Sequence, residues 1–267
     1  MLRKSGIYIL VAVLGAACVE PGENLDVAES PIVGGNLVPD TTYPSVVKLY
    51  NNSTGEAHPN CGGALIDTHW VLTAAHCVDT RNADIDVSYI RNGIEEELDS
   101  IPMQSLRVHV HEFWDPNSMN KDNDIALVRL LNDVPSDPNL MRAELPVTHG
   151  ALGQAGTVAS TYDVPTSQIQ TYDASITLKS VPSRFGTQTP SQALCSADSG
   201  SGFVTTTAGM IFLSGIVSQT AGVPPGGGCP ALPGPPGGWE ATLTDVFEYT
   251  SWIRNVLVDD GEPGTIG

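Results

Sequence analysis

The chain has 267 residues, and its 12 basic against 30 acidic side chains give a net charge of −18, which excludes a sequence-independent nucleic-acid binder. The 27 glycines and 20 prolines, with 16% charged residues, favour a loop-rich β protein over a helical bundle. The length allows one large domain or two small packed barrels.

The first residues have the features of a targeting segment. Residues 1–17 begin with the basic pair Arg3-Lys4, continue with an apolar run at 7–14 and end in small residues. The run is too short to span a bilayer, so it predicts a secretory signal. We therefore expect an extracellular or cell-envelope protein, where disulfides persist.

The 5 cysteines leave one over after two pairs, and Cys18 at the end of the predicted signal is most easily set apart. Its setting resembles the lipidation site of bacterial lipoproteins, although Gly15 stands where a branched apolar residue is usual. Lipidation and ordinary cleavage nearby both remain open. Residues 18–31 are acidic and lack apolar periodicity, which predicts a propeptide or tether.

Strands are predicted at residues 43–49 and 61–66, after an Ile-Val-Gly-Gly stretch at 32–35 that by itself indicates a strand and a turn. At residues 70–77 an apolar run passes through small residues into His76. A strand that stops at a histidine holds the ring still, as a general base near neutral pH requires. A core histidine beside a structural disulfide would show the same short pattern.

Residues 81–111 are strand-like, with alternating apolar and polar side chains near their end. His109 and His111 in this alternation have the spacing of two metal ligands, but no third ligand is suggested, so we predict a solvated strand face. An acidic cluster fits either a calcium site or a solvated turn, and we favour the turn. It consists of Glu95, Glu96, Glu97 and Asp99.

Asp124 directly precedes an apolar run at residues 125–130 that predicts a buried strand. A short acidic side chain there is placed to be partly desolvated, which a carboxylate needs if it is to orient an imidazole. The Pro-, Asn- and Gly-rich stretch at 134–160 predicts a linker.

Ser199 lies between an acid and a glycine in the stretch 195–202. On a tight turn such a serine exposes its hydroxyl while neighbouring backbone N–H groups face the same point. Asp-Ser-Gly alone is common in loops.

The last element is predicted to be a helix, because apolar residues recur every three to four positions from 246 to 257. Thr244 or Asp245 can cap its start. Residues 259–267 form a frayed acidic tail.

Three stretches, at residues 70–77, 122–127 and 195–202, resemble in the same chain order the catalytic motifs of trypsin- and chymotrypsin-like serine peptidases. The resemblance implies an all-β chymotrypsin-like fold of two packed six-stranded antiparallel β-barrels with a C-terminal α-helix. It covers a peptidase domain at residues 32–258, with barrel one at about 32–140, barrel two at about 141–243 and the helix at 244–257.

The same resemblance assigns the catalytic roles. Ser199 is the nucleophile, His76 the general base and Asp124 the residue that orients His76. The backbone N–H groups of Ala197 and Ser199 form the oxyanion hole. Relatives have glycine where this chain has Ala197, whose methyl group costs about 1 kcal/mol if the position requires a glycine-like backbone.

The resemblance also implies a new N-terminus at Ile32 after cleavage, whose amine pairs with Asp198. Relatives carry Arg or Lys before the cut, and this chain has Pro31, so the activating protease stays open. Two disulfides are implied: Cys61 with Cys77, and Cys195 with Cys229.

The implied substrate pocket has no charged side chain, and its walls carry larger residues than the glycines of wide-pocket relatives. Ser218 also supports Asp124, and the Trp-Gly usual after it is replaced by Gln219-Thr220. Two Pro/Gly-rich stretches, 221–228 and 230–238, are expected around the pocket. The pocket residues are Ala193, Leu194, Ser218, Thr220 and Ala241.

The sequence therefore predicts a secreted serine endopeptidase that cleaves after small aliphatic residues. We expect a monomer that acts on protein or peptide substrates and needs no cofactor or metal, with membrane contact only through lipidated Cys18. The alternative is a catalytically weak homologue that serves as a binding module.

Overall fold

The computed structural model describes most of the chain beyond its first 31 residues. The described residues are 32–51, 61–79, 84–92, 94–101, 107–137, 140–161, 168–207, 210–223, 228–236 and 238–259. The predicted signal, the segment 18–31 with Cys18, and the end of the predicted acidic tail lie outside them. No helix in the described part of the chain combines the length and apolar character that a membrane crossing requires.

The first half forms one seven-stranded antiparallel sheet with the order β7-β6-β3-β4-β5-β9-β8. Its strands are β3 (Val46–Asn51), β4 (Cys61–Asp67), β5 (Trp70–Thr73), β6 (Ile85–Arg91), β7 (Ile94–Ile101), β8 (Val108–Val110) and β9 (Ala126–Arg129). All four residues of β5 are buried, because this strand lies between β4 and β9 in the middle of the sheet.

The second half closes into a six-stranded antiparallel barrel with the order β10-β14-β15-β16-β12-β11, because β10 also pairs with β11. Its strands are β10 (Ala155–Ser160), β11 (Gln168–Val181), β12 (Arg184–Thr189), β14 (Gly202–Thr207), β15 (Met210–Thr220) and β16 (Trp239–Asp245). Tyr172, Ala174 and Ile176 alternate along β11 and all point into the second apolar core. The predicted two-lobed all-β fold is confirmed, with closure of the sheet seen in the second half.

Two boundaries differ from the prediction. Residues 32–39, expected in barrel one, pair with the second half: β1 (Ile32–Val33) with β13 (Ala193–Leu194), and β2 (Asn36–Pro39) with β11. The linker ends before residue 155, because β10 begins there.

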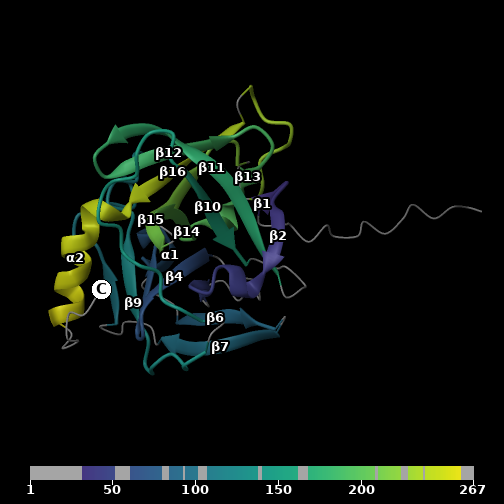
Figure 1. Cartoon of the computed structure of the whole chain (residues 1–267). Helices are drawn as coiled ribbons and strands as arrows, with labels where there is room; N and C mark the ends of the chain where they lie inside the picture. Colours follow the sequence, from purple (N-terminus) through teal and green to yellow (C-terminus); the bar gives the residue numbers. More distant parts are fainter. Residues whose placement is uncertain are drawn as a thin grey trace, which may run out of the picture.

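The C-terminal helix α2 (Val246–Asp259) begins two residues later than predicted. Asp245 rather than Thr244 caps it, since Asp245 Oδ1 accepts the Phe247 N–H at 3.2 Å. Its buried stripe, which includes Tyr249 and Ile253, packs into the apolar core of the first half. The helix thereby ties the end of the chain to the other lobe, and Figure 1 shows it at the opposite edge of the molecule from β1 and β2.

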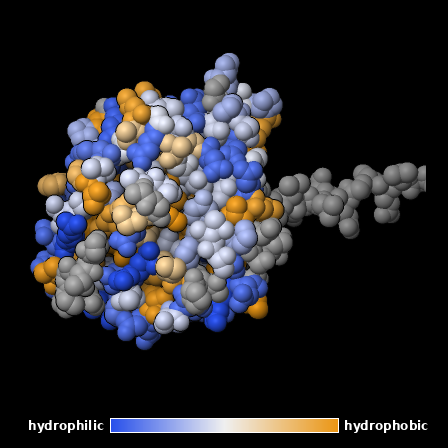
Figure 2. Space-filling model, viewed as in Figure 1, coloured by the Kyte–Doolittle hydropathy of each residue, from blue (hydrophilic) through white to orange (hydrophobic). Residues whose placement is uncertain are grey.

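The described surface is mixed in polarity. In Figure 2 hydrophilic and hydrophobic side chains are interspersed over the face in view, and the described residues there form no broad continuous apolar patch.

Candidate active site

His76 lies where β5 ends and the one-turn helix α1 (Ala75–Val78) begins. Ala74 is still extended, with φ −79° and ψ 145°, and Ala74 and Ala75 are fully buried. Side chains this small let the backbone turn within the core. The His76 side chain is 29% exposed, so a ring fixed on a buried strand end reaches the surface.

Asp124 lies just before β9, is fully buried and accepts three hydrogen bonds through its carboxylate. Oδ1 accepts the His76 backbone N–H at 2.9 Å, while Oδ2 accepts His76 Nδ1–H at 2.8 Å and the Ser218 hydroxyl at 2.5 Å. Nδ1 is the donor of this pair because a carboxylate accepts only. Nε2 of neutral His76 is then the acceptor, the tautomer that a general base needs.

Two further contacts hold the Asp124 segment from the other end of the chain. Thr244 Oγ1 donates to the Asp124 carbonyl at 2.9 Å, and the Tyr249 hydroxyl donates to Asn123 Oδ1 at 3.0 Å. Asn123 has φ 59°, a conformation that asparagine tolerates better than most residues. Sequence reasoning missed both contacts, because nothing local links β16 or α2 to this turn.

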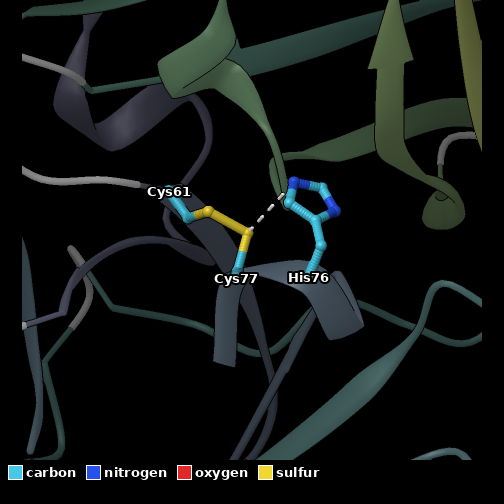
Figure 3. A group of neighbouring side chains, drawn as sticks. All are labelled: Cys61, His76 and Cys77. Carbon is cyan, nitrogen blue, oxygen red and sulfur yellow. Dashed lines mark hydrogen bonds between the residues drawn. A yellow bond between two sulfur atoms is a disulfide. The ribbon is translucent and has the colours of Figure 1, made fainter. Parts of the chain in front are cut away.

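The predicted disulfide between Cys61 and Cys77 is confirmed and lies beside the His76 ring. Figure 3 shows the three side chains, with Cys77 Sγ 3.8 Å from His76 Nε2. The cluster has the composition of a metal site, but both sulfurs are bonded to each other and neither is a thiolate. The disulfide joins the start of β4 to α1, the helix that carries His76.

Ser199 is placed against the same disulfide through its backbone. The Gly62 N–H donates to the Ser199 carbonyl at 2.8 Å. Gly200 has φ +79°, and a Cβ there would lie 3.2 Å from Cys77 Sγ, so glycine suits this turn both in conformation and in space. Since Cys77 Sγ also contacts His76, the turn that carries Ser199 lies next to the imidazole.

The structure therefore brings His76, Asp124 and Ser199 together from three distant segments. The described hydrogen bonds of His76 run to Asp124, its Nε2 lies in contact with the disulfide sulfur of Cys77, and within the described residues no hydrogen bond joins its ring to Ser199 Oγ. Catalytic hydrogen bonds of substrate-free proteins are often long and tighten when substrate binds.

The oxyanion hole predicted at the N–H groups of Ala197 and Ser199 stays a prediction, and one of these two donors has a partner within the chain. The 3₁₀ turn η3 (Ser196–Asp198) directs the Ser196 carbonyl at the Ser199 N–H, which donates to it at 3.3 Å. The Ser199 donor that was expected to face the substrate is thus occupied in this structure. The sequence placed Ala197 where relatives have glycine, but it does not show which way the Ser196–Ala197 peptide group points.

Asp198 is fully buried, and its Oδ2 accepts the Cys195 N–H at 2.7 Å. Burial raises the pKa of Asp198 to about 7, against the lowering effect of the hydrogen bond from Cys195 and of the nearby Ser160 hydroxyl. Oδ1 has no hydrogen-bond partner among the described residues.

In this uncut chain Ile32 N donates to Gln170 Oε1 at 3.0 Å rather than to Asp198. Gln170 was missed, although it alternates with the buried Tyr172, Ala174 and Ile176, and a glutamine in that register is a usable signal.

The predicted pocket residues carry no charge and lie near one another on three strands. Ala193, Leu194 and Ala241 are buried, and the last two belong to the second apolar core. Thr220 faces Ala241 across β15 and β16. Ser218, also buried, is the donor to Asp124 described above.

Trp239 at the start of β16 organises the two Pro/Gly-rich stretches. A Cβ on Gly222 or on Gly234 would lie 2.6 Å or 3.0 Å from its ring, so both glycines pack on the indole. Its Nε1 donates to the Ala231 carbonyl at 2.9 Å. The predicted disulfide between Cys195 and Cys229 is also confirmed and joins these stretches to the nucleophile turn.

The two histidines of β8 and its end do not form the predicted solvated face. His111 is 8% exposed and packs edge-on against Tyr249, with ring centroids 5.1 Å apart, and burial lowers the pKa of His111. His109 packs instead against Trp70, at 5.5 Å. His111 therefore packs against helix α2, whereas His109 packs against strand β5.

The acidic cluster is the strand β7 and not the predicted turn. Glu95 is paired with Lys48 at 2.7 Å, and Asp99 Oδ2 accepts the Asn132 N–H at 3.2 Å. Glu95 and Asp99 thus each have a protein partner, and in the described residues the cluster forms no group able to hold a metal ion.

A groove of about 760 Å³ lies elsewhere, over the second half. None of its lining residues belongs to the predicted triad or pocket, and its carboxylate, Asp173, is already bonded by Thr157 and Asn36. Size alone would make it a candidate site. The candidate active site is at His76 instead, because an oriented imidazole, a buried carboxylate and the turn of Ser199 lie there.

A two-lobed β fold with a buried aspartate, an oriented histidine and an Asp-Ser-Gly turn at the junction defines the chymotrypsin-like class of serine peptidases. A family model described as Trypsin matches residues 32–253, and the chain belongs to this family. It is 27% identical over 252 residues to chymotrypsin-like elastase family member 1 of Canis lupus familiaris, covering 86% of this chain and 93% of the relative. The Felis catus protein of the same name is 27% identical over 251 residues, covering 86% and 90%. The Homo sapiens protein is 30% identical over 124 residues, covering 46% and 48%.

Proposed function

We propose that the protein is a secreted serine endopeptidase that uses Ser199, His76 and Asp124 as its catalytic triad. Ser199 Oγ attacks a peptide carbonyl while His76 Nε2 takes its proton. His76 then returns that proton to the leaving amine, and water hydrolyses the acyl-enzyme by the same route. Asp124 holds the ring and stabilises its charged form.

The observation that carries the proposal is the bonding of Asp124. A fully buried carboxylate with three donors, two of them from His76, keeps one imidazole tautomer and one orientation. Burying a charge is costly without such partners. A binding module has no need of this arrangement, so the peptidase is favoured over the weak homologue.

The proposed specificity is for small aliphatic residues before the cut bond. Ala193 and Ala241 offer no charge to pair with Lys or Arg, and Thr220 narrows the wall where a glycine would leave it wide. Relatives named as elastases are consistent with this preference.

We also propose that the protein is secreted and is activated by cleavage before Ile32. Two disulfides suit an oxidising compartment. Asp198 Oδ1 is buried and has no hydrogen-bond partner among the described residues, so a positive charge beside it would stabilise the carboxylate. Ile32 is also buried, and it pairs with Leu194 of β13, just before the Cys195–Asp198 turn. A free Ile32 amine would supply that charge.

The test uses the full-length chain with Pro31→Arg, cut by immobilised trypsin that is then removed, with N-terminal sequencing to confirm Ile32. A fluorophosphonate probe should label the cut protein at Ser199. The matched control is the same chain with Ser199→Ala, in which turnover should fall by about 10⁶ because the triad acts as a unit. Labelling and peptidase activity that survive in this control would place the nucleophile elsewhere, and absence of both in the cut parent would favour the binding module.

A further inference from the structure

The turn that precedes Ser199 is closed by two backbone hydrogen bonds. Asp198 N–H donates to the Cys195 carbonyl at 3.2 Å, and Ser199 N–H donates to the Ser196 carbonyl at 3.3 Å. The second bond uses the group that the proposed reaction needs for the oxyanion. The direction of the peptide group between Ser196 and Ala197 therefore decides whether this donor is available.

Both ends of that peptide group are held. Ser196 N–H donates to the Gly228 carbonyl at 3.0 Å, and the Gly228 N–H donates back to Ser196 Oγ at 3.0 Å. On the other side, the buried Asp198 side chain accepts the Cys195 N–H. The Ser196–Ala197 peptide group can rotate between these two fixed points without breaking the contacts that hold them.

A four-residue turn has two common forms that differ by such a rotation. Both keep the bond between its first and fourth residues, here Cys195 and Asp198. The form with the third residue at positive φ favours glycine. Ala197 is that third residue, and it is not among the described residues with positive φ. Rotation would remove the Ser196 carbonyl from the Ser199 N–H and turn the Ala197 N–H to the same side.

We propose that Ala197 is a positioning residue whose methyl group holds the oxyanion site closed in the substrate-free protein. The proposal rests on the proposed peptidase function. The Ser196–Ala197 peptide group has to turn, and Ala197 has to reach positive φ, when the oxyanion forms in the acylation transition state, so the cost of this rotation adds to the acylation barrier and not to substrate binding. Ser196, held by Gly228, is the pivot of this rotation.

Replacing the residue changes the cost of rotation without touching the triad. Ala197→Gly should raise kcat about five- to thirty-fold, the equivalent of the roughly 1–2 kcal/mol that positive φ costs a residue with a Cβ. KM for a small peptide substrate should change little, because the side-chain pocket is intact. Affinity for a peptidyl boronate, whose oxygen occupies the oxyanion position, should rise by the same factor as kcat. Ala197→Val should move kcat and boronate affinity in the opposite direction.

The measurements are made on the full-length chain with Pro31→Arg after cleavage, for each variant and for the control Ala151→Gly. Ala151 is an exposed alanine between the two halves, so its replacement should leave kcat and boronate affinity unchanged. Unchanged kcat and boronate affinity in Ala197→Gly, with normal fluorophosphonate labelling, would overturn this inference and leave the proposed function standing. A change in melting temperature alone would overturn it too. No labelling and no hydrolysis in either protein would overturn both, whereas labelling of Ala197→Gly alone would support both.

Discussion

The backbone nitrogen of Ile32 is bonded to Gln170 Oε1 at 3.0 Å in the uncut chain, with Ile32 fully buried and Gln170 7% exposed. Gln192 holds the same segment two residues later, because its Nε2 donates to the Gly34 carbonyl at 3.2 Å. Two neutral side chains thus keep the start of the domain docked on β13 without a charged terminus.

Replacing Gln170 by methionine keeps its length and removes the acceptor. The buried Ile32 N–H loses this bond, which should lower the free energy of unfolding of the uncut chain by about 1–3 kcal/mol. Urea unfolding measures this. Gln154→Met is the matched control, since Gln154 accepts a hydrogen bond at an exposed position. Equal losses in the two variants would contradict a specific role for Gln170.

The uncut chain should lose stability as the pH rises from about 4 to about 7. The pKa of Asp198 is raised by burial from its ordinary value of 3.8 to about 7. Between these values the folded chain binds more protons than the unfolded chain, so the free energy of unfolding falls with rising pH. The fall should amount to several kcal/mol and should be absent in Asp198→Asn.

The free energy of unfolding of the uncut parent and of Asp198→Asn, measured between pH 4 and pH 8, tests this. The contributions of the other titratable groups cancel when the two proteins are subtracted. After cleavage the fall should shrink, since the Ile32 ammonium would stabilise charged Asp198. A parent and variant with parallel pH profiles would show that Asp198 does not titrate in this range.

Replacing Ser218 by alanine should lower kcat by about 10- to 100-fold, because a hydrogen bond to a charged group contributes about 1.5–3 kcal/mol. The Asp124 carboxylate would keep its bonds to His76, so the fold should survive. Ser214→Ala is the control: Ser214 is a buried serine on the same strand, bonded to Thr205 and not to Asp124. Similar kinetic losses in both would mean that the effect is structural.

Ala193→Asp tests the pocket assignment. A carboxylate at the base should reduce cleavage after alanine and valine by at least about tenfold, because it is buried without a partner in those complexes. Cleavage after lysine or arginine should increase relative to the parent. A panel of peptides that differ in the residue before the cut bond measures the rates of both kinds of cleavage. If the protein without the substitution cleaves best after arginine or lysine, the proposed preference is refuted.

The last prediction concerns Cys18 and release. If Cys18 is lipidated, cleavage before Ile32 both creates the activating amine and cuts the tether of residues 18–31. Fractionation of cells that make the parent and Cys18→Ser, with N-terminal sequencing of each pool, tests this. We expect full-length parent in the membrane fraction and protein that starts at Ile32 in the soluble one. Active protein that starts at Ile32 but stays on the membrane would exclude the idea.

The sequence by itself determined the local elements and the identity of the reacting groups. The alternation that predicted a strand near residues 106–111 and the three- to four-residue repeat that predicted α2 are both patterns among neighbouring residues, so they can be read without the fold. The three motifs in chain order identified His76, Asp124 and Ser199 because each motif is short and contiguous.

Tertiary structure alone decided how these groups meet and what holds them. The contacts of Gln170 with Ile32, of Thr244 with the Asp124 backbone and of Ser196 with Gly228 join segments far apart in the chain. Hydrogen bonds between such segments leave no periodicity in the sequence. The direction of the Ser196–Ala197 peptide group was likewise decided by the folded turn, because two backbone conformations share the same residues and differ only in which neighbour each polar group finds.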